Sequence, residues 1–434
     1  MKFMHTFVKR LLAAVLIFAL TVPICTEVVK IRDRQAVLAA IAQQTVYPDG
    51  FAESEFAART DALRALVQKS GLSEDADFSA KVKTAFSEMY HLAAEALTGK
   101  ISPTDADFER RARAVFDLLF ELDRLVQAQK AEPDLTAKDG FVAFGASILW
   151  DFMDYYDAKR LSTQEMRAGV SVLHDIPYTE NADAYQTLDI YSPEGAKTHL
   201  PVIIDIHGGG LMYGKKELNR IYASRLAEKG YIVIAVNYHL CPDVLYDTQV
   251  RDLMTAYKWV AENGKSYNCD LNNVYLVGDS AGGQLAFYTA LVNTSEELRT
   301  LYNAPETGLS FNATGLISGM YDIKSGFNSV LISCILGYEY AASPYYDVLQ
   351  PEEVIDKGTL PPSYIVTSAK DFLRPASVQL DALLTEKGIE HQFHDWELTI
   401  NRSSGHITSV AYPDLEESKV TIDEMLAFFE AHRK

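Results

Sequence analysis

The stretch Val274-Tyr-Leu-Val-Gly-Asp-Ser-Ala-Gly-Gly283 decides the fold prediction, because it joins an apolar run to a serine flanked by glycines. Val274–Val277 is typical of a buried strand, and a helical stretch, Gly282–Leu291, follows the serine. Between them the chain has the G-x-S-x-G pattern, whose small residues leave room for a very sharp strand-to-helix turn. Such a turn projects a serine hydroxyl outward, which makes Ser280 a candidate nucleophile.

Similar short apolar runs occur on both sides of this stretch and alternate with helical segments. We expect strands at 187–191, 202–206, 231–236, 274–277 and 364–367, and helices that include Arg251–Asn263 and Gly282–Leu291. The run at 231–236 is apolar almost throughout, as in a strand that is covered on both faces. Strands that alternate with helices predict an α/β fold with a mostly parallel central sheet over residues 171–434.

A second motif follows the expected strand at 202–206. His207-Gly208-Gly209-Gly210 contains three successive glycines, so backbone N–H groups can turn toward a ligand with no side chain in the way. Such a loop can supply oxyanion-hole donors from Gly208, Gly209 and Gly210, and the N–H of Ala281 can supply another. The two motifs therefore predict a nucleophile and an oxyanion hole at one site.

A serine hydroxyl needs a base within hydrogen-bond reach and a carboxylate that orients the base. Asp371 follows the expected strand at 364–367, and His406 lies in the small-residue loop Ser403-Ser-Gly-His406. Both occur in the order serine, acid, histidine that this arrangement requires. Ser280, Asp371 and His406 are therefore the candidate catalytic residues.

Other residues are alternatives for the base and the acid. His391 and His394 lie in Glu390-His-Gln-Phe-His394, on or beside a strand, and either one is an alternative base. Because residues at i and i+3 point to opposite faces of a strand, this pair does not predict a metal site. Asp395 is an alternative to Asp371.

With these motifs in place, the chain resembles the hormone-sensitive lipase family of α/β-hydrolases, in particular its bacterial esterases. The matching stretches are His207–Gly210, Gly278–Gly283, Asn237-Tyr-His-Leu-Cys-Pro242, Ser343-Pro344, Asp371 and His406. The resemblance covers roughly residues 175 to 430. It implies Ser280 as nucleophile, Asp371 as orienting acid and His406 as general base. Family members often carry Arg where His239 stands and Phe where Ile407 stands.

The resemblance implies a serine carboxylesterase that hydrolyses carboxylic esters through an acyl-enzyme intermediate, without a metal or an organic cofactor. The fold does not fix the leaving group, so amidase, peptidase or lactonase activity on the same triad stays open. An alternative that is not an enzyme is a binding module that reuses the α/β-hydrolase fold. The expected partner is a small-molecule ester, and the sequence does not indicate an oligomeric state.

Residues 27–170 form an N-terminal helical region that the family resemblance does not cover. Apolar side chains recur there at steps of three and four, which places them on one face of a helix. The two stripes are Phe78, Val82, Ala85, Met89, Leu92 and Ala96, and Phe108, Ala112, Val115, Leu119, Leu122 and Val126. The region is predicted to be a cap, a spacer or a partner-binding module. The segment between Met320 and Leu360 is expected to contribute to the cap.

Residues 1–26 have the pattern of a targeting segment. Lys2, Lys9 and Arg10 precede an apolar run over residues 11–25, as in a secretory signal peptide. No clean small-residue cleavage site follows the run, so a retained membrane anchor is an equal alternative. The sequence therefore predicts an exported protein that is either secreted or anchored to the membrane.

Charge and cysteine content narrow the kinds of partner and metal site that the protein is expected to have. The formal net charge is −19 over 434 residues, which disfavours nucleic acid as a partner because a phosphate backbone would be repelled. The four cysteines are Cys25, Cys241, Cys269 and Cys334, and no CxxC pair occurs that would indicate a zinc site. Unpaired buried thiols are expected, with one disulfide as the alternative.

Overall fold

A computed structural model describes residues 53–97, 100–101, 106–130, 140–324, 331–396 and 405–434. The chain divides into two compact units. The first runs to Ala158 and includes Ser325–Tyr340, and the second comprises Lys159–Lys324 and Ala341–Lys434. The sequence predicts a domain boundary between residues 170 and 171. The structural division instead lies after Ala158, and it assigns Ser325–Tyr340, from the segment after Met320, to the first unit.

The first unit is helical. Its helices are α3 (Glu53–Ser70), α4 (Ala76–Leu97), α5 (Ala106–Gln127), most of α6 (Phe141–Ser162) and α11 (Ile332–Leu336). Helices α4 and α5 lie against each other, and both predicted stripes face this core. The buried members are Phe78, Val82, Ala85, Met89, Leu92, Ala112, Val115, Leu119, Leu122 and Val126. The periodicity prediction is thus confirmed where side chains are described.

A buried aspartate from α5 caps the start of α6 within this unit. Asp123 accepts hydrogen bonds from the backbone N–H groups of Phe141 at 2.5 Å and Val142 at 2.9 Å. Burial raises the pKa of this carboxyl to about 7, although both donors oppose the shift. Gly140 is required beside it, because a Cβ there would lie 2.5 Å from the Asp123 carboxylate oxygens.

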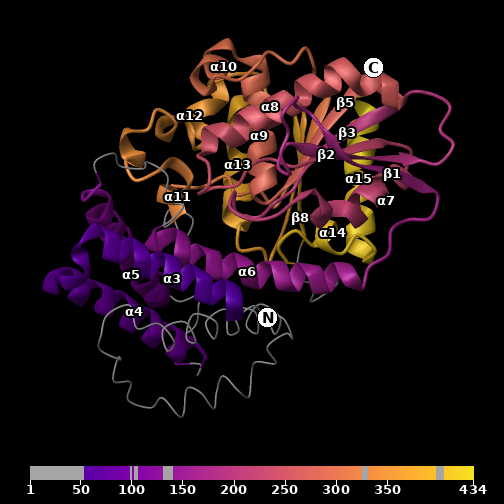
Figure 1. The fold of residues 1–434 in the computed structure, drawn as a ribbon. Coiled ribbons are helices and arrows are strands. Elements are labelled where there is room, and N and C mark those ends of the chain that lie inside the picture. The colour runs from indigo at the N-terminus through magenta and orange to yellow at the C-terminus, as the bar shows by residue number, and fades with distance from the viewer. Residues whose placement is uncertain (1–52, 98–99, 102–105, 131–139, 325–330, 397–404) are drawn as a thin grey trace. The chain divides into compact units, whose positions relative to one another are not determined.

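The second unit is built on one eight-stranded sheet in the order β1-β2-β4-β3-β5-β6-β7-β8 (Figure 1). The strands are β1 (Val170–Pro177), β2 (Thr187–Pro193), β3 (Leu200–Ile206), β4 (Ile232–Val236), β5 (Cys269–Asp279), β6 (Ala313–Ile317), β7 (Ser363–Ser368) and β8 (His391–Trp396). β1 pairs antiparallel with β2, and β2 antiparallel with β4; the other pairs are parallel. The predicted α/β fold with a mostly parallel sheet is confirmed.

Helices cover both faces of this sheet. They are α7 (Arg220–Glu228), α8 (Tyr246–Asn263), α9 (Ala281–Thr294), α10 (Glu296–Tyr302), α12 (Pro351–Val354), α13 (Arg374–Lys387), α14 (Thr408–Ala411) and α15 (Glu416–Ala431). In Figure 1, α8 and α9 lie on the opposite side of the strands from α7 and α15. Strands that are covered in this way are buried on both faces, which is why β4 is apolar throughout.

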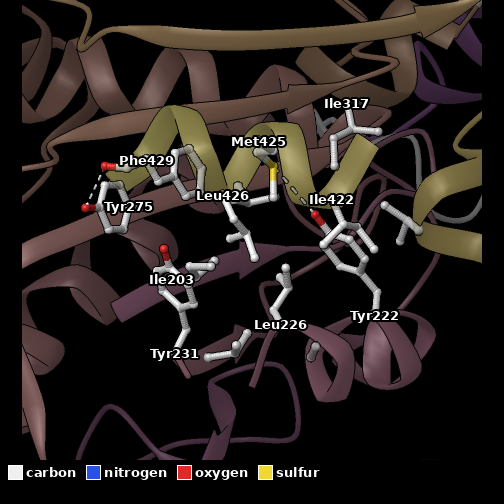
Figure 2. Close-up of a cluster of buried hydrophobic side chains, with 14 of the residues drawn as sticks. Ile203, Tyr222, Leu226, Tyr231, Tyr275, Ile317, Ile422, Met425, Leu426 and Phe429 are labelled. Atoms are coloured by element: carbon white, nitrogen blue, oxygen red, sulfur yellow. Dashed lines mark hydrogen bonds between the residues drawn. The ribbon is translucent and has the colours of Figure 1, made fainter. Parts of the chain in front are cut away.

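The core between the sheet and the α7/α15 layer contains several aromatic side chains and the sulfur of Met425 (Figure 2). The Tyr275 ring stacks on Phe429 with centroids 4.5 Å apart, and its hydroxyl donates to the Phe429 carbonyl at 2.9 Å. Tyr222 donates to the Met425 sulfur at 3.7 Å. A Cβ on Gly315 of β6 would lie 2.7 Å from that sulfur, so the close approach of α15 requires glycine there.

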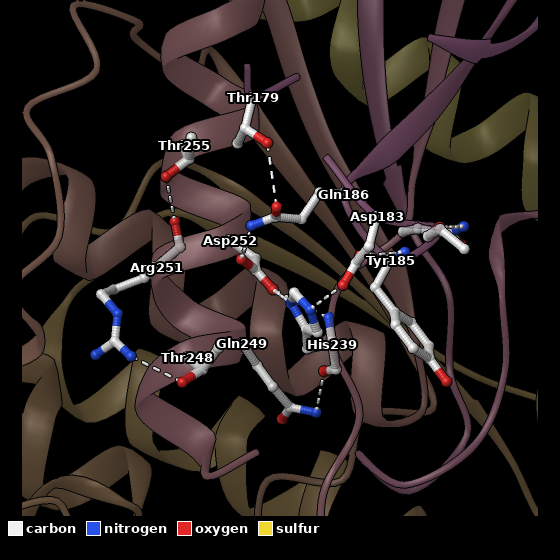
Figure 3. Close-up of polar contacts among 12 residues, drawn as sticks. Thr179, Asp183, Tyr185, Gln186, His239, Thr248, Gln249, Arg251, Asp252 and Thr255 are labelled. Atoms are coloured by element: carbon white, nitrogen blue, oxygen red, sulfur yellow. Dashed lines mark hydrogen bonds and ion pairs between the residues drawn. The ribbon is translucent and has the colours of Figure 1, made fainter. Parts of the chain in front are cut away.

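A charged cluster ties the β1–β2 connection to α8 (Figure 3). His239 Nδ1 lies 2.6 Å from Asp252 Oδ2, and its Nε2 lies 2.9 Å from Asp183 Oδ2. The hydrogen bond that His239 donates to Asp252 and the charges of both carboxylates outweigh burial and raise the pKa of His239 to about 9. A protonated imidazole therefore supplies the cation at the position where family members often carry Arg.

No helix in the described part of the chain is long and apolar enough to cross a membrane. The predicted targeting segment, residues 1–26, lies outside the described residues.

We expect the stability of the second unit to fall between about pH 6.5 and pH 9 because of His239. Its folded pKa is about 9 against an ordinary value of 6.5, so its contribution is complete below pH 6.5 and is lost as the pH rises through 9. After allowance for partial exposure, the loss should be about 1–2 kcal/mol. Urea unfolding of wild type and His239→Arg at several pH values tests this, since arginine keeps its charge. Curves that stay parallel from pH 6.5 to 9.5 would contradict it.

Candidate active site

Ser280 stands on the turn between β5 and α9, in a backbone conformation that few residues adopt. Its φ is 53° and its ψ is −120°, a strained combination for a residue with a Cβ. The surrounding backbone enforces it. The Ser280 N–H donates to the Ile317 carbonyl at 2.8 Å, and the Met320 N–H donates to the Ser280 carbonyl at 3.0 Å.

The glycines of the motif are required by close backbone contacts. A Cβ on Gly278 would lie 2.2 Å from the Gly282 carbonyl oxygen, and a Cβ on Gly282 would lie 2.0 Å from the Ile206 carbonyl oxygen. The turn can therefore form only if both positions lack a side chain. This is the physical reason for the spacing of glycines around the serine.

Three strands bring the predicted residues to one edge of the sheet. β3, β5 and β7 run in the same direction, so their carboxyl ends meet there. His207 follows β3, Ser280 follows β5, and Asp371 lies just after β7. His406 lies just before α14.

The side chains of Ser280, His406 and Asp371 form a hydrogen-bonded chain. His406 Nε2 lies 3.0 Å from Ser280 Oγ, and His406 Nδ1 lies 2.9 Å from Asp371 Oδ1. The Asp371 side chain is fully buried, whereas the His406 ring is partly exposed. The three residues that the sequence singles out are thus brought together in the geometry of a base that links a hydroxyl to a carboxylate.

Asp371 is held in its ionised form. Burial alone would raise its pKa, but the charge of His406 and hydrogen bonds from His406, Ser318 and the Leu373 N–H lower the pKa below the ordinary value. Leu373 N donates to Asp371 Oδ1 at 2.9 Å and Thr367 Oγ1 to Oδ2 at 3.2 Å. The carboxylate can therefore orient the imidazole and balance a positive charge on it.

The alternative residues are paired elsewhere. His391 Nε2 lies 3.0 Å from Asp381 Oδ1, and His394 Nδ1 lies 2.5 Å from Glu424 Oε2. Asp395 accepts two hydrogen bonds of 3.0 Å from Arg374 Nε. None of these three forms a hydrogen bond to Ser280 among the described residues, so the geometry favours His406 and Asp371.

The glycine run lies beside the serine. Gly209 and Gly210 have φ values of 125° and 61°, and a Cβ on Gly208 would lie 2.6 Å from Asp279 Oδ2. Ala281 is the first residue of α9, so its N–H has no partner within the helix. Gly208 lies against Ser280, where a Cβ on it would be 3.0 Å from the serine Cβ, and the Ala281 N–H directly follows the serine, so the glycine run and Ala281 are placed where an oxyanion hole would form.

His207 supports this loop, a role that the sequence did not indicate. Its ring is buried, stacks on Tyr238 with centroids 4.4 Å apart, and has Nδ1 2.8 Å from the Gly208 carbonyl. The Tyr238 hydroxyl donates to the His207 carbonyl at 2.7 Å. Burial lowers the pKa of His207 to about 4, so the neutral ring donates its Nδ1 proton to Gly208. The position of a histidine directly before three glycines is the sequence feature that could have indicated this supporting role.

A buried polar group lies under the same loop. Asn219 Nδ2 donates to Asp279 Oδ1 at 2.8 Å and approaches Asp205 Oδ1 at 3.3 Å. Burial raises the pKa of Asp279 to about 6, and the pKa of Asp205 rises well above its ordinary value. Asp279 also accepts a hydrogen bond from the Gly208 N–H, which connects the serine motif to the glycine run. The sequence did not predict this contact, because Asn219 belongs to neither motif.

Within the described ranges, no group of three or more His, Cys, Asp or Glu side chains is placed to hold a metal ion. Cys241, Cys269 and Cys334 are buried and form no disulfide there, and burial raises the pKa of Cys269 to about 12. Cys25 lies outside the described residues.

Comparison with known proteins adds to this geometry. The family model BD-FAE matches residues 188–383. Over 121 residues the chain is 35% identical to versiconal hemiacetal acetate esterase of Dothistroma septosporum, covering 26% of this chain and 37% of that protein. It is 27% identical to esterase LipQ of Mycobacterium tuberculosis over 51% of this chain and 56% of LipQ. The chain thus spans between about a third and about half of these relatives.

A solved structure extends the similarity over nearly a whole protein. Esterase B of Lactobacillus rhamnosis superposes with a TM-score of 0.63 at 28% identity, covering 66% of this chain and 93% of that one. The same esterase has also been solved with a tributyrin phosphonate inhibitor.

The fold, the strand-to-serine turn and these relatives together define an α/β-hydrolase. Within that superfamily, the chain is similar to carboxylic ester hydrolases related to the hormone-sensitive lipase family.

The two glycines with positive φ should respond differently to substitution. A Cβ on Gly209 would lie 1.9 Å from the Tyr213 carbonyl oxygen, so the loop must move in Gly209→Ala. We expect a loss of about 2–4 kcal/mol in the free energy of unfolding. Gly210 adopts the left-handed conformation, for which alanine costs about 1–2 kcal/mol. Urea unfolding of both variants measures the difference, and equal losses would show that the contact with Tyr213 does not constrain the loop.

Proposed function

We propose that this protein is a serine carboxylesterase in which Ser280 is the nucleophile, His406 the general base and Asp371 the residue that orients His406. The observation that carries the proposal is the pair of hydrogen bonds that link Ser280 Oγ to His406 Nε2 at 3.0 Å and His406 Nδ1 to Asp371 at 2.9 Å. Esterase relatives and the phosphonate complex of Esterase B support it, since a phosphonate resembles the tetrahedral intermediate of ester hydrolysis.

The first half of the proposed reaction acylates the enzyme. His406 Nε2 takes the proton of Ser280 as Oγ attacks the ester carbonyl carbon, and the carbonyl π electrons move to the oxygen. The N–H groups of Gly209, Gly210 and Ala281 stabilise this oxyanion, with about 3–4 kcal/mol for each key donor, while the Gly208 N–H is held by Asp279. The C–O bond to the alcohol then breaks, and His406 returns the proton to the leaving oxygen.

The second half releases the acid. His406 removes a proton from water, and the resulting hydroxide attacks the acyl carbon. The intermediate collapses to a carboxylic acid, and Ser280 regains its proton from His406. Asp371 stays ionised throughout, because its pKa is held below the ordinary range. Each half therefore uses the same three side chains and the same backbone donors.

Substitution of each member of the triad tests the assignment. We expect Ser280→Ala and His406→Ala to lower kcat for p-nitrophenyl acetate by about 10⁴-fold or more, and Asp371→Asn by about 10³- to 10⁴-fold, because asparagine disturbs the tautomer of His406. All three should keep the wild-type circular dichroism spectrum.

Matched controls are His391→Ala and His394→Ala, whose rings pair with Asp381 and Glu424. Both should keep kcat within about a factor of three, since losses at surface pairs are small. Activity that survives His406→Ala but not one of these changes would refute the base assignment.

We also propose that the protein is exported, through the basic residues Lys2, Lys9 and Arg10 and the apolar run at 11–25. The full chain with a C-terminal tag should appear outside the cytoplasm after fractionation, either free with a new N-terminus or in the membrane fraction with the original one. A full-length chain confined to the cytoplasm would contradict the proposal.

A further inference from the structure

Phe372 directly follows Asp371 and is the most exposed large apolar side chain in the described part of the chain. Its exposed fraction is 61%, against 52% for the next, Leu173. Its ring contacts the imidazole of His406, with centroids 4.4 Å apart and planes inclined by 46°. An exposed aromatic ring therefore lies against the proposed catalytic base.

The backbone holds this ring in place. Asp371 N donates to the Ser368 carbonyl at 2.9 Å, and Arg374 N donates to the Asp371 carbonyl at 3.2 Å. Leu373 is buried and its N–H donates to the Asp371 carboxylate. The turn thus directs Asp371 and Leu373 into the protein and Phe372 out to solvent. The ring adds little to the core, and an exposed apolar surface at a reactive group commonly marks a contact for a ligand.

The proposed reaction determines which part of a ligand this ring would meet. His406 Nε2 must return its proton to the oxygen of the departing alcohol, so that oxygen lies within hydrogen-bond reach of the imidazole. The carbon atoms of the alcohol are attached to this oxygen and extend away from the acyl group. Phe372 contacts the same imidazole, and it is therefore next to the alcohol rather than the acyl chain.

We propose that Phe372 forms the wall of an alcohol-side subsite that takes apolar alcohols, aromatic ones above all. The inference rests on the proposed function, since it assumes that His406 protonates the leaving group. An aromatic alcohol gains contact area and ring–ring interaction at Phe372 that a short alkyl alcohol lacks. The subsite thus sets specificity for the leaving group and leaves the choice of acyl chain to other residues.

A purely positional role for Phe372 makes a different prediction. If the ring only kept His406 oriented, its removal would slow every ester by the same factor and through kcat. A subsite wall instead changes the ratio between alcohols, mainly through KM, and leaves the ratio between acyl chains unchanged.

Two matched ester series separate these roles. The first varies the alcohol at constant acyl group, with ethyl, butyl and benzyl acetate. The second varies the acyl group at constant alcohol, with ethyl acetate, butanoate and hexanoate. Acid release is followed by pH-stat titration with the full-length protein. The variants are Phe372→Ala, Phe372→Leu, and Leu173→Ala as an exposed apolar control on β1, which five strands separate from β7 in the order of the sheet.

We expect wild type to have a higher kcat/KM for benzyl acetate than for ethyl acetate. In Phe372→Ala the ratio of these two values should fall about tenfold, which is the effect expected when a small apolar contact is lost. Phe372→Leu should fall between the two, because it keeps apolar surface without the ring. Leu173→Ala should match wild type, and the acyl-series ratios should be the same in all four proteins. The pH profile of kcat/KM for ethyl acetate should not move in Phe372→Ala.

Several results would overturn the inference alone. These are a wild type that hydrolyses ethyl acetate without preferring benzyl acetate, a uniform loss on all esters in Phe372→Ala, or a change confined to the acyl series. A wild type that hydrolyses none of the esters overturns the proposed function, and this inference with it. If Phe372→Ala does not fold, the wild-type preference and Phe372→Leu decide the question.

Discussion

The turn at Ser280 depends on the close approach of three backbone segments, and the rest of the site depends on the turn. The chain can pass from β5 into α9 this sharply because Gly278 and Gly282 carry no side chain, and the end of β3 packs against Gly282. This contact places the glycine run after β3 beside the serine. The strained backbone of Ser280 persists because hydrogen bonds to Ile317 and from Met320 hold it. One packing constraint thus positions the proposed nucleophile and its backbone donors together.

Electrostatics divides the site into two layers with different roles. Next to the partly exposed His406 ring, the buried Asp371 is kept ionised by His406 and by the donors around it, so it can balance a charge on the imidazole. Beneath the loop, burial disfavours ionisation of Asp205 and Asp279, and Asn219 bridges them. The lower layer is buried and connects Asp279 to Gly208, which suits a role in holding the loop. The site therefore combines one carboxylate that is kept ionised, Asp371, with two whose ionisation is disfavoured by burial, Asp205 and Asp279.

The helical unit follows its own packing rules. Helices α4 and α5 bury the apolar stripes that their periodicity predicts, and Asp123 caps α6 from within this core. The segment Ser325–Tyr340, which follows β6 in sequence, belongs to this unit. Tyr338 of this segment packs on Phe120 of α5 with ring centroids 5.7 Å apart. The hydrolase sequence therefore contributes a piece to the helical unit, a connection that periodicity along the chain cannot indicate.

The sequence by itself determined the fold class, the strands β2, β3, β4, β5 and β7, and the serine, aspartate and histidine that the structure brings together. It could do so because glycine spacing and apolar runs are local constraints on backbone and burial. It did not predict β1, which is mostly exposed, or β6, where Gly315 interrupts the apolar pattern to admit Met425. The pairing of the alternatives His391 and His394 with other carboxylates, the support of the loop by His207 and Asn219, and the contact of Phe372 with His406 were decided by tertiary structure alone. Each depends on distances between residues far apart in the chain, which only the packing of strands and helices fixes.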